Sequence, residues 1–144
     1  DLATGDKAGG DYGRFDSLYG PRRFDYGPTG IYGPLGRNNI SALGADFEFK
    51  PSPRLDGFIK YRAAWLDSPS DSFANTGVRD GTARSGSFGG HQIETRLRYW
   101  LVPEFLRLDT GGAVLLNGRF LREAPNANGF GNPVYGYLDV TATF

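Results

Sequence analysis

Long runs of alternating apolar and polar side chains limit the fold of this chain more than any other feature. They cover residues 55–66, 92–101, 106–117 and 134–144, with a weaker run over 39–49. A period of two places successive side chains on opposite faces of a β-strand. The runs have about 10–12 residues, whereas strands of soluble proteins usually have about 5–6 and tilted transmembrane strands need about 9–11. Strand length therefore favours an all-β, antiparallel transmembrane β-barrel.

The connections between these runs alternate between short and long. Residues 50–54 and 102–105 are tight turns that contain proline, whereas residues 67–91 and 118–133 are long, polar and rich in glycine. Outer-membrane barrels have short periplasmic turns and longer extracellular loops. The connection lengths therefore favour the same class of fold, with both short turns on the periplasmic side.

The N-terminal part of the chain has a different character. Residues 1–38 are rich in Gly, Pro and Tyr and repeat Tyr-Gly-Pro from Tyr19, Tyr26 and Tyr32, which is a turn signature. We expect residues 1–38 to be an extracellular loop segment and residues 39–144 to form about five C-terminal strands of a larger barrel. Bacterial barrels normally have an even number of strands starting at about 8, and open sheet edges are prohibitive in hydrocarbon. The chain is therefore expected to be a fragment of a larger barrel.

Composition excludes several other kinds of function. The absence of cysteine and the single histidine exclude disulfides, thiolate metal sites and multi-histidine metal sites. No nucleophile accompanies that histidine, so we predict no enzyme activity, no cofactor and no metal site. The 16 basic and 16 acidic residues cancel, so overall charge does not indicate nucleic acid. No apolar run approaches the ~18–20 residues of a helical membrane span.

Each expected strand has one apolar face and one charged face, and the fold depends on which of them meets the solvent. Alternation alone fits either a barrel with its apolar face in lipid or a soluble carbohydrate-binding β-sandwich with its apolar face inside. In the sandwich, Trp100 and the loop tyrosines would stack on sugars. Aromatic residues near the ends of the apolar faces favour the barrel, because Trp and Tyr prefer membrane interfaces. These aromatic residues are Phe49, Tyr61, Trp65, Tyr99 and Phe144.

Basic side chains on the charged face are the candidate functional residues. Rings of basic side chains in a water-filled pore favour anions, and arginine adds bidentate recognition of carboxylates. The alternative is that they pair with Asp46, Glu48, Glu94 and Asp109 across the strands and hold the wall together. Arg22 and Arg23 are predicted to lie in the loop near the pore mouth. The predicted pore-lining residues are Lys60, Arg62, Arg96, Arg98, Arg107 and Arg119.

The chain also resembles the alginate export family of outer-membrane porins. The likeness lies in GRFDSLYGPRRF (13–24), YRAAWL (61–66), TGVRD (76–80), GHQIETR (90–96) and FLREAPN (120–126). The resemblance implies a large single-chain barrel in the bacterial outer membrane that passes an anionic polyuronate through an arginine-lined pore. The expected partners are an anionic polysaccharide, outer-membrane lipid and the barrel-insertion machinery, since the C-terminal aromatic Phe144 resembles the signal that this machinery reads.

Overall fold

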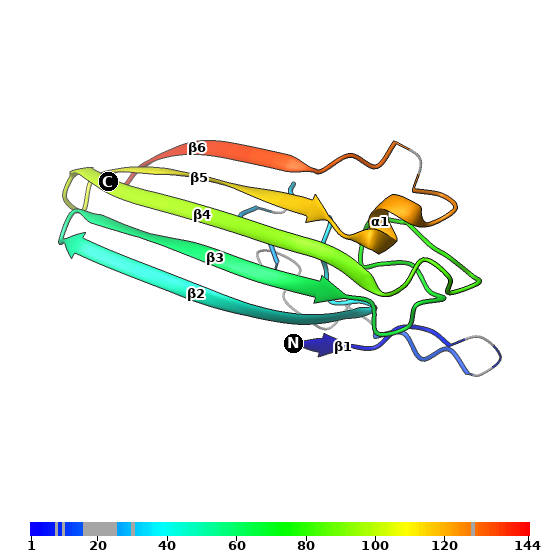
Figure 1. Ribbon diagram of the computed structural model, residues 1–144. Coiled ribbons are helices and arrows are strands. Elements are labelled where there is room, and N and C mark those ends of the chain that lie inside the picture. The colour runs from blue at the N-terminus through cyan, green and yellow to red at the C-terminus, as the bar shows by residue number, and fades with distance from the viewer. Residues whose placement is uncertain (8, 10, 16–25, 30, 128) are drawn as a thin grey trace.

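The computed structural model describes residues 1–7, 9, 11–15, 26–29, 31–127 and 129–144. Its strands form one antiparallel sheet in which sequence neighbours are also spatial neighbours, and this sheet does not close on itself (Figure 1). The prediction of an all-β, antiparallel fold is confirmed. The elements are β1 (Leu2–Ala3), β2 (Ile40–Ser52), β3 (Leu55–Trp65), β4 (Phe88–Val102), β5 (Leu106–Asn117), a short helix α1 (Arg119–Glu123) and β6 (Val134–Ala142).

Short turns join the strands at one end of the sheet, and the long connections gather at the other end (Figure 1). The β2–β3 turn closes where Ser52 pairs with Leu55, and the β4–β5 turn closes where Val102 pairs with Leu106. Proline, which cannot continue a strand ladder, stands in both turns. Glu104 completes the second turn with a φ of 62°. Turn chemistry therefore sets the register of both tight hairpins.

Several strands differ from their predicted bounds: β1 lies within the segment predicted as a loop, β2 runs on to Ser52 rather than ending at residue 49, and β4 and β6 differ as follows. β4 begins at Phe88 rather than at residue 92, because the ladder continues through Gly90 to a bulge at which Phe88 pairs with Trp65. Gly90 has a φ of 151°, and a Cβ there would lie 2.3 Å from the carbonyl oxygen of Leu116, so only glycine suits this position. β6 ends at Ala142, so Phe144 lies past the strand and is fully exposed.

The sheet exposes its apolar face and covers much of its polar face. Leu43 and Leu138 on the apolar face are 73% and 66% exposed, whereas Gln92 and Glu94 on the polar face are 2% and 7% exposed. A soluble sandwich would pack its apolar face against a second sheet, and the described residues form a single sheet. The burial pattern therefore suits a wall that has lipid on its apolar side.

Aromatic residues bracket the exposed apolar rows. Near the long connections, Trp65 packs on Phe88, Phe88 on His91, and His91 on Tyr61, whose hydroxyl lies 2.7 Å from His91 Nδ1. Near the short turns, Phe49 contributes a ring at the other end of the face. Girdles of this kind lie at both interfaces of membrane barrels. No helix in the described part of the chain has both the length and the apolar character needed to span a membrane.

The hydrophobic core lies in the long connections rather than between the strands. Phe73, Phe120 and Leu121 from the connections are fully buried against Ile40 and Leu115 at the ends of β2 and β5. The prediction of plain polar loops was therefore incomplete, because these connections carry enough apolar side chains to form a packed unit with α1. We call residues 67–87 and 118–127 the cap.

We expect Leu138→Arg to destabilise the inserted protein by about 2–4 kcal/mol, the cost of an arginine facing hydrocarbon near the middle of a membrane strand. Leu138 is the middle residue of β6 and lies on the exposed apolar face. The matched control is Asp139→Arg, one residue along on the polar face, where Asp139 stands opposite Asp109. Urea unfolding in lipid vesicles measures both changes. Equal stability of the two variants would contradict a lipid-facing position for Leu138.

Candidate functional site

The polar face of strands β2 to β6 carries five of the six predicted pore-lining bases, all but Arg119, and we call this face the polar wall. Because the strands are in antiparallel register, polar residues of neighbouring strands form rows across the sheet. Phe58, Arg96, Gly111 and Tyr137 form one such row. Two further rows are Asp46, Lys60, Glu94, Ala113 and Tyr135, and Asp56, Arg98, Asp109 and Asp139.

Several bases of the polar wall form ion pairs with wall carboxylates. Lys60 Nζ lies 3.0 Å from Asp46 Oδ2, and Arg98 Nε lies 3.4 Å from Asp109 Oδ2. These side chains are partly exposed, so each pair contributes only about 0.2–1 kcal/mol. The cross-strand pairing foreseen as an alternative therefore occurs at these positions, and it leaves the wall accessible.

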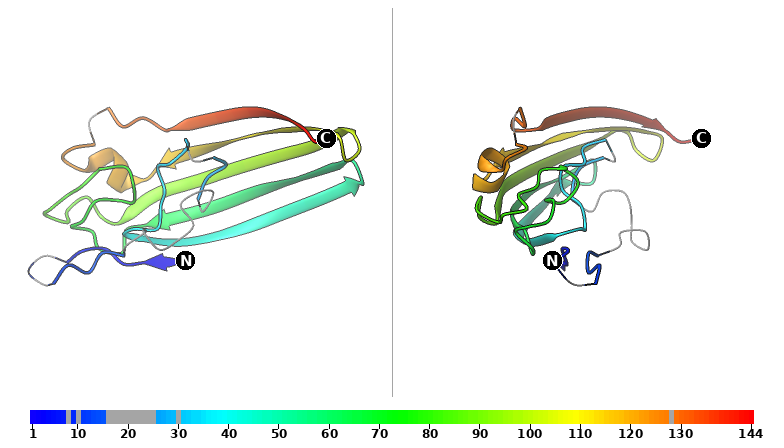
Figure 2. Two further views of the ribbon diagram at one scale, coloured as in Figure 1. Left: turned by 180° about the vertical axis from the view of Figure 1, so that it is seen from behind. Right: turned by 90° about the vertical axis from the view of Figure 1, so that its right-hand side faces the viewer.

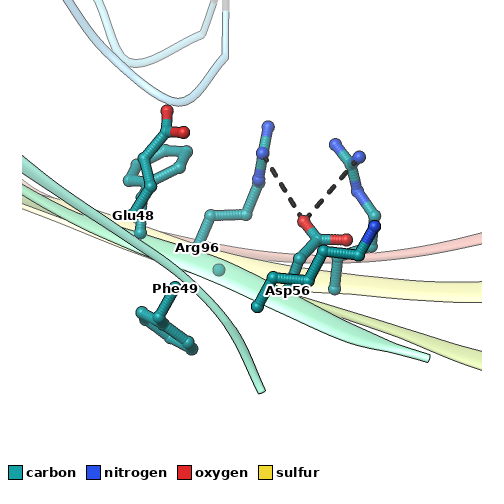
Figure 3. A pocket seen from close by; sticks show the side chains of 8 residues that line it. Glu48, Phe49, Asp56 and Arg96 are labelled. Atoms are coloured by element: carbon teal, nitrogen blue, oxygen red, sulfur yellow. Dashed lines mark ion pairs between the residues drawn. The ribbon is translucent and has the colours of Figure 1, made fainter. Parts of the chain in front are cut away.

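Arg96 and Arg98 have a different arrangement, because they share one carboxylate. The terminal nitrogens of both guanidiniums lie 3.9 Å from the same oxygen, Asp56 Oδ1 (Figure 3). That distance is too long for a hydrogen bond. Arg96 Nε is buried and has no hydrogen-bond partner. The terminal nitrogens of the two partly exposed arginines, rather than the buried Nε, therefore retain donors that an incoming anion can engage.

An open cleft of about 340 Å³ lies over these arginines near the short turns. In Figure 3, Glu48, Asp56 and Arg96 point to one side of the sheet and Phe49 to the other. Charged groups of both signs line the cleft, with one more basic than acidic side chain. Its lining residues are Glu48, Phe49, Lys50, Asp56, Gly57, Phe58, Arg96 and Arg98.

Phe58 organises the bases beside the cleft, and it was not singled out from the sequence. The Lys60 ammonium lies 4.5 Å and the Arg96 guanidinium carbon 4.6 Å from the centroid of its ring. Cations at this distance are attracted to the ring face. The signal in the sequence was that Phe58 falls on the same strand face as the charged side chains of β3. The ring holds two cations side by side without neutralising them.

Part of the N-terminal segment lies against the polar wall. Gln92 Nε2 donates a hydrogen bond to the carbonyl oxygen of Tyr26, and the Arg62 guanidinium lies 4.5 Å from the Tyr26 ring centroid. Tyr32 is buried, and its ring centroid lies 6.0 Å from that of Tyr135. Burial and the charge of Glu94 raise the pKa of the Tyr32 hydroxyl. In the end-on view of Figure 2, this part of the chain lies on the concave side of the curved sheet.

The other predicted bases lie apart from the cleft. The Arg107 guanidinium lies 5.5 Å from the Trp100 ring centroid at the short-turn end of the wall. Arg119 lies in α1 of the cap, where its Nε donates to Glu123 at 2.7 Å and the bond raises the pKa of Arg119. Arg22 and Arg23 lie outside the described residues.

Acidic side chains of the cap serve as hydrogen-bond acceptors. Asp80 accepts bonds from the backbone and hydroxyls of Thr82 and Ser85, which hold the pKa of its carboxyl below the usual range. Asp71 pairs with Arg14 at 3.3 Å and accepts the Asp6 amide at 3.0 Å. In the described part of the chain, no three His, Cys, Asp or Glu residues are grouped so that they could hold a metal ion.

A single antiparallel sheet with a lipid-suited face, aromatic girdles and a charged, accessible face defines the wall of an outer-membrane β-barrel porin. Residues 1–131 match the alginate export family, and the chain belongs to this family. The family comprises transport porins of the bacterial outer membrane and not enzymes, which gives the chain a general role in alginate export. No curated protein and no solved structure matches the chain.

Proposed function

We propose that the polar wall lines a water-filled pore that passes an alginate-like polyuronate. The observation that carries this proposal is the pairing of Arg96 and Arg98 on one Asp56 oxygen, with both distances at 3.9 Å. Arginine matches a carboxylate through two parallel hydrogen bonds, and each residue of a polyuronate carries one carboxylate. Weakly engaged arginines can exchange Asp56 for successive substrate carboxylates without leaving a buried charge unpaired.

The remaining predicted bases extend this path along the wall. Lys60 and Arg62 follow Arg96 toward the cap, and Arg107 lies toward the short turns. Wall carboxylates pair with some of these bases, which keeps binding weak enough for release. A polymer that must move needs several weak sites rather than one strong site. Arg119 in α1 and the loop residues Arg22 and Arg23 stay predicted contributors at the pore mouth.

We further propose that this sheet is one sector of a closed barrel. The order β1 to β6 leaves two edges whose backbone groups lack strand partners within the described residues. Unpaired backbone groups cost several kcal/mol each in hydrocarbon, so further strands must complete the wall. The exposed apolar face then contacts outer-membrane lipid. Recognition of the C-terminal strand by the barrel-insertion machinery stays a prediction.

Electrical recording from the full-length protein in planar lipid bilayers tests the proposed pore. In a potassium chloride gradient we expect a reversal potential that shows preference for anions. Oligouronates of defined length should interrupt the current, whereas neutral malto-oligosaccharides of equal length should do so far less. A cation-selective channel that uronates do not block would contradict the proposed function.

A further inference from the structure

We propose that Tyr135 and Tyr137 of β6 form a platform on which pyranose rings of the polyuronate stack, and we call the two residues the tyrosine platform. This inference rests on the proposed pore and adds a second kind of contact to it. Arginines recognise the carboxylate of each sugar, but they do not hold its ring. Both tyrosines lie on the polar wall and are half-buried, so each keeps some exposed surface, although Tyr32 also packs on Tyr135.

A glycine in the neighbouring strand makes room for the first ring. Gly111 of β5 stands opposite Tyr137, and a Cβ at Gly111 would lie 3.0 Å from Tyr137 Cε1. The ring therefore lies over the glycine, across the surface of β5. A ring that lies over a glycine can turn its face to the lumen, whereas a ring that stood upright would present an edge.

A chain of polar contacts fixes the orientation of the same ring. Tyr137 Oη donates to Asp109 Oδ1 at 3.0 Å, and Asp109 Oδ2 accepts from Arg98 Nε at 3.4 Å. The hydroxyl of the platform is thus tied to one of the two arginines that share Asp56. Ring and guanidinium are ordered together before any ligand arrives, which lowers the entropic cost of binding.

The second ring continues the surface along the strand. The centroids of Tyr135 and Tyr137 lie 6.3 Å apart with 25° between the ring planes. Ala113, a small residue, stands opposite Tyr135 on β5. The two rings are spaced along β6 and have similar tilts. They could therefore stack on successive sugars of a polymer that runs along the strand. The axial C–H groups of a pyranose carry partial positive charge, and the face of an aromatic ring carries the complementary negative charge.

The chemistry of a uronate fits the distance between platform and arginine. Arg96, Gly111 and Tyr137 are direct partners across three adjacent strands, so the backbones of Arg96 and Tyr137 lie about 10 Å apart. The Tyr137 ring reaches into this interval over the side-chain-free position of Gly111, whereas the Arg96 guanidinium lies over Phe58 on the other side of β4. A sugar that stacks on the platform can therefore place its carboxylate toward the arginines. A small inorganic anion would use only the arginines.

Single-channel recordings of oligouronate block separate stacking from charge. We expect Tyr135→Leu/Tyr137→Leu to shorten the residence time of the blocking oligouronate by roughly tenfold, and each single leucine variant to shorten it by roughly threefold. Tyr137→Phe keeps the ring face and loses only the bond to Asp109 that orients it, so its residence time should stay within about twofold of the unchanged protein. The anion preference in potassium chloride should be the same in all four proteins. Heat-modifiable migration on gels verifies that each variant is folded.

Tyr99→Leu is the matched control, because Tyr99 lies on the opposite, apolar face of the sheet. If uronates block the channel but the residence time is the same in all the leucine variants, the platform proposal is wrong. The proposed pore is unaffected by that result. A channel without anion preference or uronate block would overturn both proposals. An equal loss in Tyr99→Leu would assign the effect to general disturbance of the wall and also overturn the platform.

Discussion

Replacing Arg96 and Arg98 together by glutamate is expected to convert an anion-preferring conductance into a cation-preferring one. The substitution changes the charge beside the cleft by four units, and Asp56 and Glu48 already contribute negative charge there. At physiological salt the Debye length is about 8 Å, so charges that line a narrow passage act on every ion that crosses it. We expect the ratio of chloride to potassium permeability to fall by on the order of tenfold or more.

The matched control for this reversal is Arg119→Glu/Arg122→Glu. It changes net charge by the same amount, but both residues lie in α1 of the cap rather than on the polar wall. Reversal potentials in asymmetric potassium chloride measure both double variants. A shift of equal size in the α1 variant would show that selectivity is set at the mouth of the pore, and the assignment to Arg96 and Arg98 would then be wrong.

Replacing Phe120 by alanine is expected to destabilise the cap by about 3–5 kcal/mol, the usual loss when a fully buried phenylalanine is truncated. Phe120 has no exposed surface and packs edge-on against Phe73, with ring centroids 6.4 Å apart. The loss combines the transfer free energy of the ring with a cavity that Leu121 and Ile40 fill only in part. Native-state hydrogen exchange of the amides in residues 67–87 measures the local free energy of opening.

Phe105→Ala provides the comparison, because Phe105 lies in the short β4–β5 turn and is 47% exposed. We expect it to change amide protection of the cap by less than about 0.5 kcal/mol. Similar effects of the two substitutions would mean that the connections do not form a cooperative packed unit. Loss of protection in β3 and β4 in the Phe120 variant would extend the role of the cap to the whole sheet.

Periodicity made the strands and the composition of the two faces predictable. Alternation repeats over about ten residues in each strand, so one or two exceptions such as Phe58 do not hide it. The two tight, proline-containing turns were predicted as well, and they close β2–β3 and β4–β5. Alternation therefore assigns Arg96 and Arg98 to the same face of β4, whereas their partners across the sheet come from the structure.

The cap was not predictable by the same means. α1 has five residues, which is too short for a helical period to show, and Phe73 is separated from Phe120 by two strands. The glycines made this packing hard to foresee. They lower the hydropathy of the connections, and they also leave room for large neighbouring side chains to pack. A Cβ at Gly89 would lie 2.2 Å from Phe73 Cζ, so this glycine is a packing position rather than a flexible loop residue.

The sequence predicts which strand face carries the basic residues of the site, but it does not predict the aromatic rings that they contact. Sequence spacing assigns Lys60 and Arg96 to one face, but their shared contact with the Phe58 ring depends on the packing of β3 against β4. The contact of Tyr26 and Tyr32 with the polar wall depends on irregular turns that have no period. Arg119 was assigned to the pore by its charge, and the structure places it in the cap.

The position of the cap at one end of the sheet has a mechanical consequence. At that end, interlocked side chains from two long connections fix the separation of β2, β3, β4 and β5, as the tightly packed core of a soluble protein does. At the other end, hairpin turns, backbone ladders and partly exposed ion pairs such as Arg98–Asp109 set the spacing of the strands. The sheet is therefore stiffer at the cap than at the short turns, so in the proposed pore a wide or folded polymer would strain the end with the short turns more readily.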